Sequence, residues 1–235
     1  VHGALNGEHR RPPRHALRAA RRLGVHAADM TGDLERLLAV DRPAGLRLSA
    51  WDNDRAALAA TLVWVSAAPR PDALDLLAEA TRNGSEMVAR NAVSYLEGLG
   101  PRAEPVVDAL TAILHERDIG RPRVAKAIVA VSPDMFDEVL SVVVAQVSSD
   151  DPVIASFGDA ELKYLSQGHW GELGAAEPAL ISALESRPPA DAAELSAQVR
   201  RLDTRNSRKA YNAYVRRRRL AERAADGAPA AGRGN

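Results

Sequence analysis

Apolar positions along the chain recur with a helical period and are interrupted at regular intervals. The stretch 96–114 reads LEGLGPRAEPVVDALTAIL, in which one apolar run ends just before Gly100 and a second begins after Pro105. Glycine readily adopts the left-handed conformation that ends a helix, and proline is favoured in the first turn of a helix. The stretch therefore predicts two antiparallel helices joined by a short turn.

The same pattern, an apolar run closed by an aliphatic residue and then Gly or Ser, recurs along the chain. Five such runs end 32 to 42 residues apart, at Leu23, Val65, Leu99, Val131 and Leu165. Each interval has room for a hairpin of two helices. Asp151 precedes a proline and is expected to cap the helix that follows. We expect helices at 14–23, 28–40, 54–65, 71–81, 85–99, 104–116, 122–131, 133–147, 151–165, 177–184, 190–202 and 207–225.

Three stretches lack this pattern. Residues 41–54 (DRPAGLRLSAWDND) predict an insertion loop, with or without a short helix at 46–51. The Gly-rich residues 167–176 predict a turn, and the aperiodic end of the chain predicts disorder. We therefore divide the chain into a flexible arm (1–13), a helical array (14–203), a basic C-terminal helix (204–225) and a disordered tail (226–235).

Two parts of the array, 17–38 (LRAARRLGVHAADMTGDLERLL) and 88–114 (VARNAVSYLEGLGPRAEPVVDALTAIL), match each other. Counting from Leu23 and from Leu99, an alanine follows at four positions and leucines at eleven and fifteen. This pattern resembles HEAT-like repeats of the short bacterial type, although Ser replaces Gly in later units, at 132 and 166. The resemblance implies an all-α, right-handed α-solenoid of about five to six helical hairpins, whose usual role is to bind proteins, peptides or nucleic acids.

Composition narrows the classes of function. Aromatic residues make up only 4% of the chain, so the core must consist mostly of Leu, Val and Ala, which suits packed helices. The absence of cysteine excludes disulfides, thiolate metal ligands and a cysteine nucleophile. Neither a membrane-spanning apolar run nor a secretory signal is present, so we expect a cytoplasmic protein. The 28 arginines against 3 lysines suggest a GC-rich bacterial genome.

The zero net charge conceals an uneven distribution. Residues 1–25 carry +5, residues 26–199 carry −13, and residues 200–235 carry +8. An acidic body with two basic ends indicates either attraction within or between chains, or a polyanionic partner at the ends.

The sequence contains no catalytic motif, phosphate-binding loop or metal-ligand spacing among its six histidines. It favours a non-enzymatic protein without a cofactor. One enzymatic alternative remains, because HEAT-like DNA alkyl-base glycosylases use a cleft of Trp, Asp and Arg. The chain has these residue types, without a motif-level match, at Trp51, Asp52, Arg55 and Arg90.

Candidate binding residues fall into three sets. For each set, the alternative to a binding role is that the residues are ordinary charged residues on a solvent-exposed surface. In HEAT-like arrays the second helix of each hairpin lines the concave face, which implies Arg55, Arg90, Asn91, Tyr95, Arg123, Lys126, Lys163 and Tyr164. The C-terminal helix offers arginines for phosphates and tyrosines for bases, at Arg208, Lys209, Tyr211, Tyr214, Arg216, Arg217, Arg218 and Arg219. The N-terminal cluster comprises Arg10, Arg11, Arg14, Arg18, Arg21 and Arg22.

These sets support three hypotheses of different classes. The first is a non-enzymatic protein-interaction scaffold or adaptor that binds another protein through its concave face or its basic ends. The second is a nucleic-acid-binding protein that grips phosphates with the arginine clusters and the concave basic residues. The third is the glycosylase. For the C-terminal helix the alternative is a polar cap that docks on its own array.

Overall fold

The computed structural model describes residues 14–42, 46–67, 70–116 and 123–226. The described chain is all-α: it is 87% helical and has no strand. The chain divides into two compact units, residues 1–139 (unit 1) and 140–235 (unit 2). Their boundary lies within the stretch 14–203, for which the sequence predicts one continuous array.

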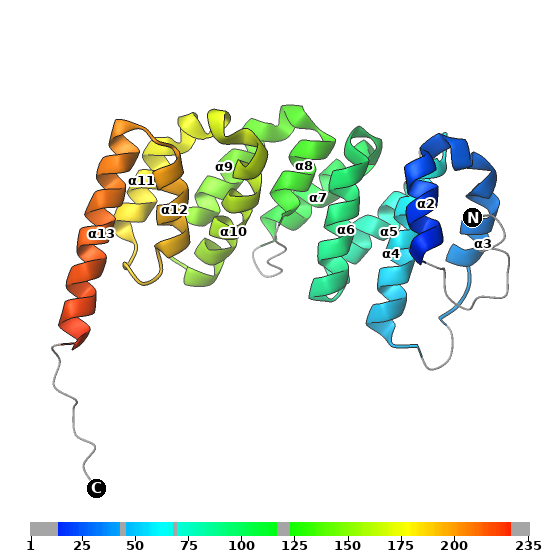
Figure 1. The fold of residues 1–235 in the computed structure, drawn as a ribbon, viewed down its shortest axis with the longest axis horizontal. Coiled ribbons are helices and arrows are strands. Elements are labelled where there is room, and N and C mark those ends of the chain that lie inside the picture. The colour runs from blue at the N-terminus through cyan, green and yellow to red at the C-terminus, as the bar shows by residue number, and fades with distance from the viewer. Residues whose placement is uncertain (1–13, 43–45, 68–69, 117–122, 227–235) are drawn as a thin grey trace, which may run out of the picture. The chain divides into compact units, whose positions relative to one another are not determined.

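Unit 1 is built from consecutive helices that pack on one another. Helices α2, α4, α6 and α8 are successive neighbours, and α3, α5 and α7 pack beside them (Figure 1). The helices of this unit are α2 (Arg14–Leu23), α3 (Thr31–Leu38), α4 (Leu48–Val65), α5 (Pro71–Asn83), α6 (Glu86–Leu99), α7 (Val107–His115) and α8 (Val124–Val131). Short 3₁₀ segments occupy Gly24–Met30, Gly100–Val106 and Pro133–Met135.

Unit 2 begins within α9 and ends with the long basic helix α13. Its helices are α9 (Phe136–Val147), α10 (Pro152–His169), α11 (Glu177–Ser186), α12 (Ala193–Arg201) and α13 (Arg205–Asp226), with a 3₁₀ segment at Trp170–Ala176. Asp151 caps α10 as expected, because its Oδ1 accepts a hydrogen bond from the backbone N–H of Val153 at 2.8 Å.

Helix α4 is the centre of unit 1 and corrects the predicted insertion loop. It begins at Leu48, so residues 48–54, half of the stretch 41–54, are helical. The helix contacts α2, α3, α5 and α6, and 12 of its 18 residues are buried. The buried residues include the polar Asn53 and Asp54 near its start, so this part of the sequence lacks the amphipathic period by which a helix is recognised. Trp51, which is 5% exposed, packs in the core.

The predicted turn at 167–176 is also wrong. Helix α10 continues to His169, and the following seven residues form a 3₁₀ helix. Gly168 is tolerated near the end of α10 because it costs a helix only about 1 kcal/mol relative to alanine. Leu173, 1% exposed, anchors the 3₁₀ segment in the core. The predicted arm 1–13 and the tail beyond Asp226 lie outside the described residues.

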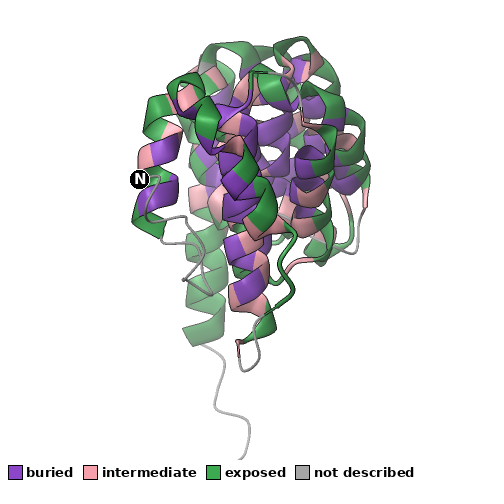
Figure 2. Ribbon diagram, turned by 90° about the vertical axis from the view of Figure 1, so that its right-hand side faces the viewer, coloured by how far each residue is buried: buried purple, intermediate pink, exposed green. Residues whose placement is uncertain are grey.

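The core consists of small and aliphatic side chains, as the composition indicates. Ala56, Ala59, Ala60 and Leu62 of α4 are fully buried. Figure 2 shows buried residues on the sides of the helices that face other helices, with exposed residues on the opposite sides. Alanines at these contacts allow close approach of the helix backbones.

In unit 2 a close approach of this kind joins α10 to the end of α9 at Gly158. A Cβ atom at this position would lie 2.5 Å from the backbone nitrogen of Val147 and 2.8 Å from the carbonyl carbon of Gln146. Both are backbone atoms, which cannot move away as a flexible side chain can. Glycine is therefore required here by packing.

We expect Gly158→Ala to lower the free energy of unfolding by about 1–3 kcal/mol, because the added methyl group overpacks the α9–α10 contact. Gly168→Ala is the matched control in the same helix, since a Cβ there meets no atom within 4 Å. We expect it to be neutral or to stabilise by up to about 1 kcal/mol, the difference in helix propensity. Urea denaturation followed by circular dichroism measures both, and equal effects would contradict the packing argument.

A buried ion pair joins three segments of unit 2. Arg187 donates to Asp159 Oδ2 at 2.6 Å and to the carbonyl of Ala155 at 3.4 Å, and its Nη2 also contacts the carbonyl of Val147. The two side chains are 10% and 8% exposed. Burial raises the pKa of Asp159 above its ordinary value, because the opposing effect of the Arg187 hydrogen bond and charge is smaller. The pair fixes α10 against the end of α9.

Candidate anion-binding surfaces

The basic C-terminal helix docks on its own unit. Ser207, Ala210 and Tyr214 are buried at spacings of three and four residues, and this inner face of α13 packs against α11 and α12. The Tyr214 hydroxyl donates to the carbonyl of Pro189 at 3.3 Å. The docking predicted as the alternative for this helix is therefore present within unit 2 (Figure 1).

A local motif that the sequence analysis overlooked starts this helix. Thr204 and Ser207 cap it reciprocally: the Ser207 N–H donates to Thr204 Oγ1 at 3.0 Å, and the Thr204 N–H donates to Ser207 Oγ at 2.9 Å. Asp203, with φ of 52°, makes the turn from α12. A Thr followed three residues later by Ser is a variant of the capping box and could have been found in the sequence.

Arg217 extends the docked face by capping the C-terminus of α11. Its Nη2 donates to the carbonyl of Leu184 at 2.6 Å, and its Nη1 donates to the carbonyl of Glu185 at 2.6 Å. The last carbonyls of a helix have no partner within the helix and carry partial negative charge. Arg217, predicted as a binding residue, thus uses its guanidinium within unit 2.

The opposite face of α13 carries an uninterrupted row of exposed polar side chains. The positions recur every three or four residues and define what we call the outer stripe: Arg205, Lys209, Asn212, Arg216, Arg219 and Arg223. None of its five cations forms an ion pair within the described part of the chain. The stripe extends from Arg205 to Arg223, and the 18 steps between them give a length of about 27 Å at 1.5 Å per residue.

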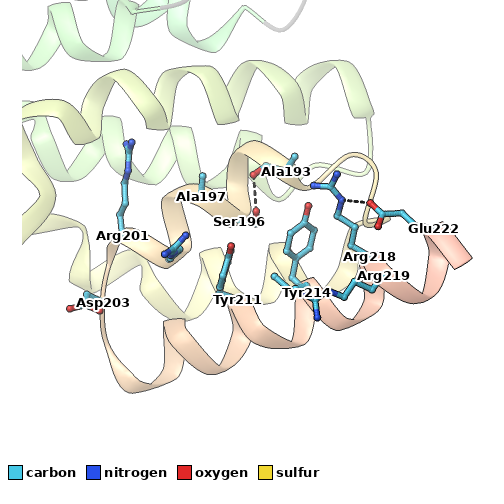
Figure 3. Close-up of a pocket in the computed structure, with 12 residues that line it drawn as sticks. Ala193, Ser196, Ala197, Arg201, Asp203, Tyr211, Tyr214, Arg218, Arg219 and Glu222 are labelled. Carbon is cyan, nitrogen blue, oxygen red and sulfur yellow. Dashed lines mark hydrogen bonds and ion pairs between the residues drawn. The ribbon is translucent and has the colours of Figure 1, made fainter.

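A groove of about 880 Å³ runs between α12 and α13, next to the outer stripe. Figure 3 shows Tyr211 and Tyr214 pointing from α13 toward α12, with Arg218 bonded to Glu222 at 2.8 Å. The guanidinium carbon of Arg200 lies 5.1 Å from the ring centre of Tyr211, and the two tyrosine rings are 6.4 Å apart. Tyr214 is 3% exposed, and Arg200 lies over one face of the half-buried Tyr211, so little ring surface is left for a base.

The basic residues predicted for the concave face mostly have acidic partners. Arg123 and Lys126 both contact Glu97, at 2.7 and 2.6 Å. Arg90 pairs with Glu86 at 2.6 Å, and in unit 2 Lys163 lies 3.4 Å from Glu194. Such pairing makes these surfaces mixed in charge rather than basic. Arg55 and Tyr164 are half-buried, and Arg208 lies 3.6 Å from Asp203.

The structure brings two of the predicted sets together in unit 1. Arg14, Arg18 and Arg21 of the N-terminal cluster lie beside Asn91 and Tyr95 of the concave set, around one cavity between α2, α4 and α6. By contrast, the residues considered for a glycosylase form no open cleft with Trp51, which lies in the core. Arg10 and Arg11 lie outside the described residues.

Other classes of site are not evident in the ranges that the structure covers. There, no group of three or more His, Asp or Glu side chains is arranged to hold a metal ion. In the same ranges, no helix is long and apolar enough to cross a membrane. Comparison of the chain with protein-family models, with curated proteins and with solved structures finds no match.

Proposed function

We propose that the chain is a HEAT-like α-solenoid that binds nucleic acid, without catalysis, through the outer stripe of α13. The observation that carries the proposal is the row of five exposed cations without ion-pair partners in the described chain. Consecutive helices that pack in pairs within each unit support the repeat architecture.

The outer stripe suits a phosphate backbone in length and in rigidity. Its length of about 27 Å corresponds to about eight base pairs at 3.4 Å each. Because the inner face and Arg217 hold α13 in place, the helix that carries the cations is already ordered before a ligand arrives. A preorganised surface binds more tightly, since less conformational entropy is lost on association.

The state of the tyrosines favours contacts with phosphates over contacts with bases. Stacking requires an open aromatic face, whereas Tyr214 is buried and Arg200 occupies one face of the half-buried Tyr211. Binding through phosphates alone is independent of sequence and depends strongly on salt. We therefore expect duplexes of different sequence to bind with similar affinity.

A triple variant of the outer stripe, Lys209→Gln/Arg216→Gln/Arg219→Gln, tests this proposal. Fluorescence anisotropy with a labelled duplex of about 20 base pairs is measured between about 50 and about 200 mM salt. We expect the slope of log affinity against log salt to become less steep by about 2.7, because each lost phosphate contact contributes about 0.9.

The matched control removes the same net charge elsewhere. Arg36, Arg90 and Lys163 are cations whose side chains already contact carboxylates, so Arg36→Gln/Arg90→Gln/Lys163→Gln should leave the slope nearly unchanged. Equal effects of the two triple variants would show that net charge alone is responsible. Absence of binding by the parent protein at the lower salt concentration would overturn the proposal.

A protein-interaction scaffold is the second candidate. The observation that favours it is the ion pairing around Glu97 and Glu194, which gives the faces of α6, α8 and α10 a mixed charge. Mixed polar surfaces suit the rim of a protein interface better than they suit a polyanion. If the duplex fails to bind, this role becomes the better interpretation of the fold.

A further inference from the structure

A small cavity in unit 1 has the chemistry of an anion site and is separate from α13. It lies between α2, α4 and α6 and has a volume of about 170 Å³. Arg14, Arg18 and Arg21 line it from α2, while Asn53 and Asn91 line it from α4 and α6. The volume equals that of roughly five or six water molecules at about 30 Å³ each.

The Asn53 side chain indicates that this cavity is built for a ligand. Asn53 is 7% exposed, and its Oδ1 accepts a hydrogen bond from Asn91 Nδ2 at 2.6 Å. Its two N–H donors have no partner among the described residues. A buried amide with unused donors is costly unless it finds an acceptor. The Nδ2 group of Asn53 can therefore donate to water or to a ligand that enters the cavity.

Arg21 is held in place beside this amide pair. Its guanidinium carbon lies 4.9 Å from the ring centre of Tyr95, within the range of a cation–π contact. The Nε–H group of Arg21 is closed off from solvent and donates to no partner in the described structure. The tyrosine thus restricts the guanidinium to the edge of the cavity without neutralising its charge.

The charges around the cavity define the ligand. Arg14 lies 3.4 Å from Asp54, which is 2% exposed, so one carboxylate offsets one of the three arginines. The remaining charge of about +2 matches a phosphomonoester, which carries about −1.5 to −2 at neutral pH. Guanidinium groups match phosphate oxygens in a bidentate manner, and each asparagine can add a donor.

We propose that this cavity binds the phosphate group of a small phosphomonoester. Arg18 and Arg21 hold the phosphate oxygens, and the amide of Asn53 donates to the oxygen that lies deepest. Leu17 and Ala57, which also line the cavity, contact the few carbon atoms of the ester. The volume leaves no room for a larger group to be enclosed.

The experiment uses O-phosphoserine as the probe and the full chain labelled with ¹⁵N. Titration followed by NMR should show saturable shifts of the Asn53 and Asn91 side-chain amides, and serine should cause none. Binding should weaken when the pH falls from about 7.5 to about 5, because the phosphate then takes up its second proton near pH 6. Shifts that are confined to α13, or no binding in the millimolar range, would overturn the proposal.

Two neighbouring arginines provide a variant and its control. Arg18→Gln should weaken binding at least about tenfold and should leave the fold intact, because Arg18 is exposed. Arg22→Gln removes the same charge from the same helix but does not line the cavity, so it should leave the affinity unchanged. Equal weakening by both would show nonspecific attraction and refute the site. The triple variant of the outer stripe should bind O-phosphoserine as the parent does, which separates this test from that of the proposed function.

Discussion

Arg187→Met is expected to lower the free energy of unfolding by about 3–5 kcal/mol. The substitution removes the donors to Asp159 and to the carbonyls of Val147 and Ala155, and it leaves a carboxylate that is 8% exposed without its cation. A buried charge that loses its partner keeps its cost of desolvation and gains nothing in return. Chemical denaturation followed by circular dichroism measures the loss.

The double variant Asp159→Leu/Arg187→Met distinguishes two contributions to the free energy of unfolding: the cost of a buried charge without a partner, and the net stabilisation by the ion pair. Because apolar residues of similar size replace buried pairs with little loss, we expect the double variant to recover much of the stability. Lys163→Met is the control at an exposed pair, where the side chains are 45% and 42% exposed, and should cost less than about 1 kcal/mol. If Arg187→Met also lowers the free energy of unfolding by less than about 1 kcal/mol, the buried ion pair does not have the stabilising role assigned to it.

The pH dependence of Arg187→Met provides a second readout of the same prediction. The pKa of Asp159 is raised in the folded parent, and removal of Arg187 takes away the groups that lower it. A carboxyl whose folded pKa exceeds its unfolded value favours folding below the unfolded pKa, and this contribution is lost as the pH rises through the folded pKa. We therefore expect the variant to regain part of its stability, relative to the parent, as the pH falls from 7 toward 5.

Arg217→Ala is expected to lower the free energy of unfolding by about 2–3 kcal/mol, whereas Arg216→Ala should change it by less than about 0.5 kcal/mol. Arg217 caps the last carbonyls of α11, and truncation leaves Leu184 and Glu185 without these charged donors. Arg216 points away from the unit on the outer stripe. Thermal denaturation of the two variants tests the difference.

When duplex binding is measured in place of stability, we expect the order of the two effects to reverse, so that Arg216→Ala has the larger effect. Arg216→Ala should weaken binding and reduce the salt dependence by about 0.9, since it removes one phosphate contact. Arg217→Ala should bind nearly as the parent does at temperatures where it remains folded. Equal losses of binding would indicate that Arg217 faces the ligand and that its contacts with α11 are not maintained.

The sequence by itself determined the class of fold and the position of most helices. Helix α2 ends where the apolar period predicts, at Leu23. Gly100, with φ of 56°, ends α6 as expected. These features could be predicted because they depend on local properties, namely the 3.6-residue period and the conformational freedom of glycine. Helix α4 was misjudged at its start because the polar residues Asn53 and Asp54 are buried there by contacts with α6 and α2, and those contacts depend on the neighbouring helices.

The tertiary structure alone decided which charged residues remain available to a partner. The sequence alone does not distinguish Arg216 from Arg217 as candidate binding residues. It likewise gives no reason to rank Arg123 and Lys126 below Arg18. Docking of α13 directs Arg217 to α11 and Arg216 to solvent, and helix packing places Glu97 against Arg123 and Lys126. The cavity with its buried amide likewise exists only because α2, α4 and α6 meet. The physical reason is that desolvation and ion pairing depend on distances of a few ångströms between segments that are far apart in the chain, and a sequence pattern does not contain those distances.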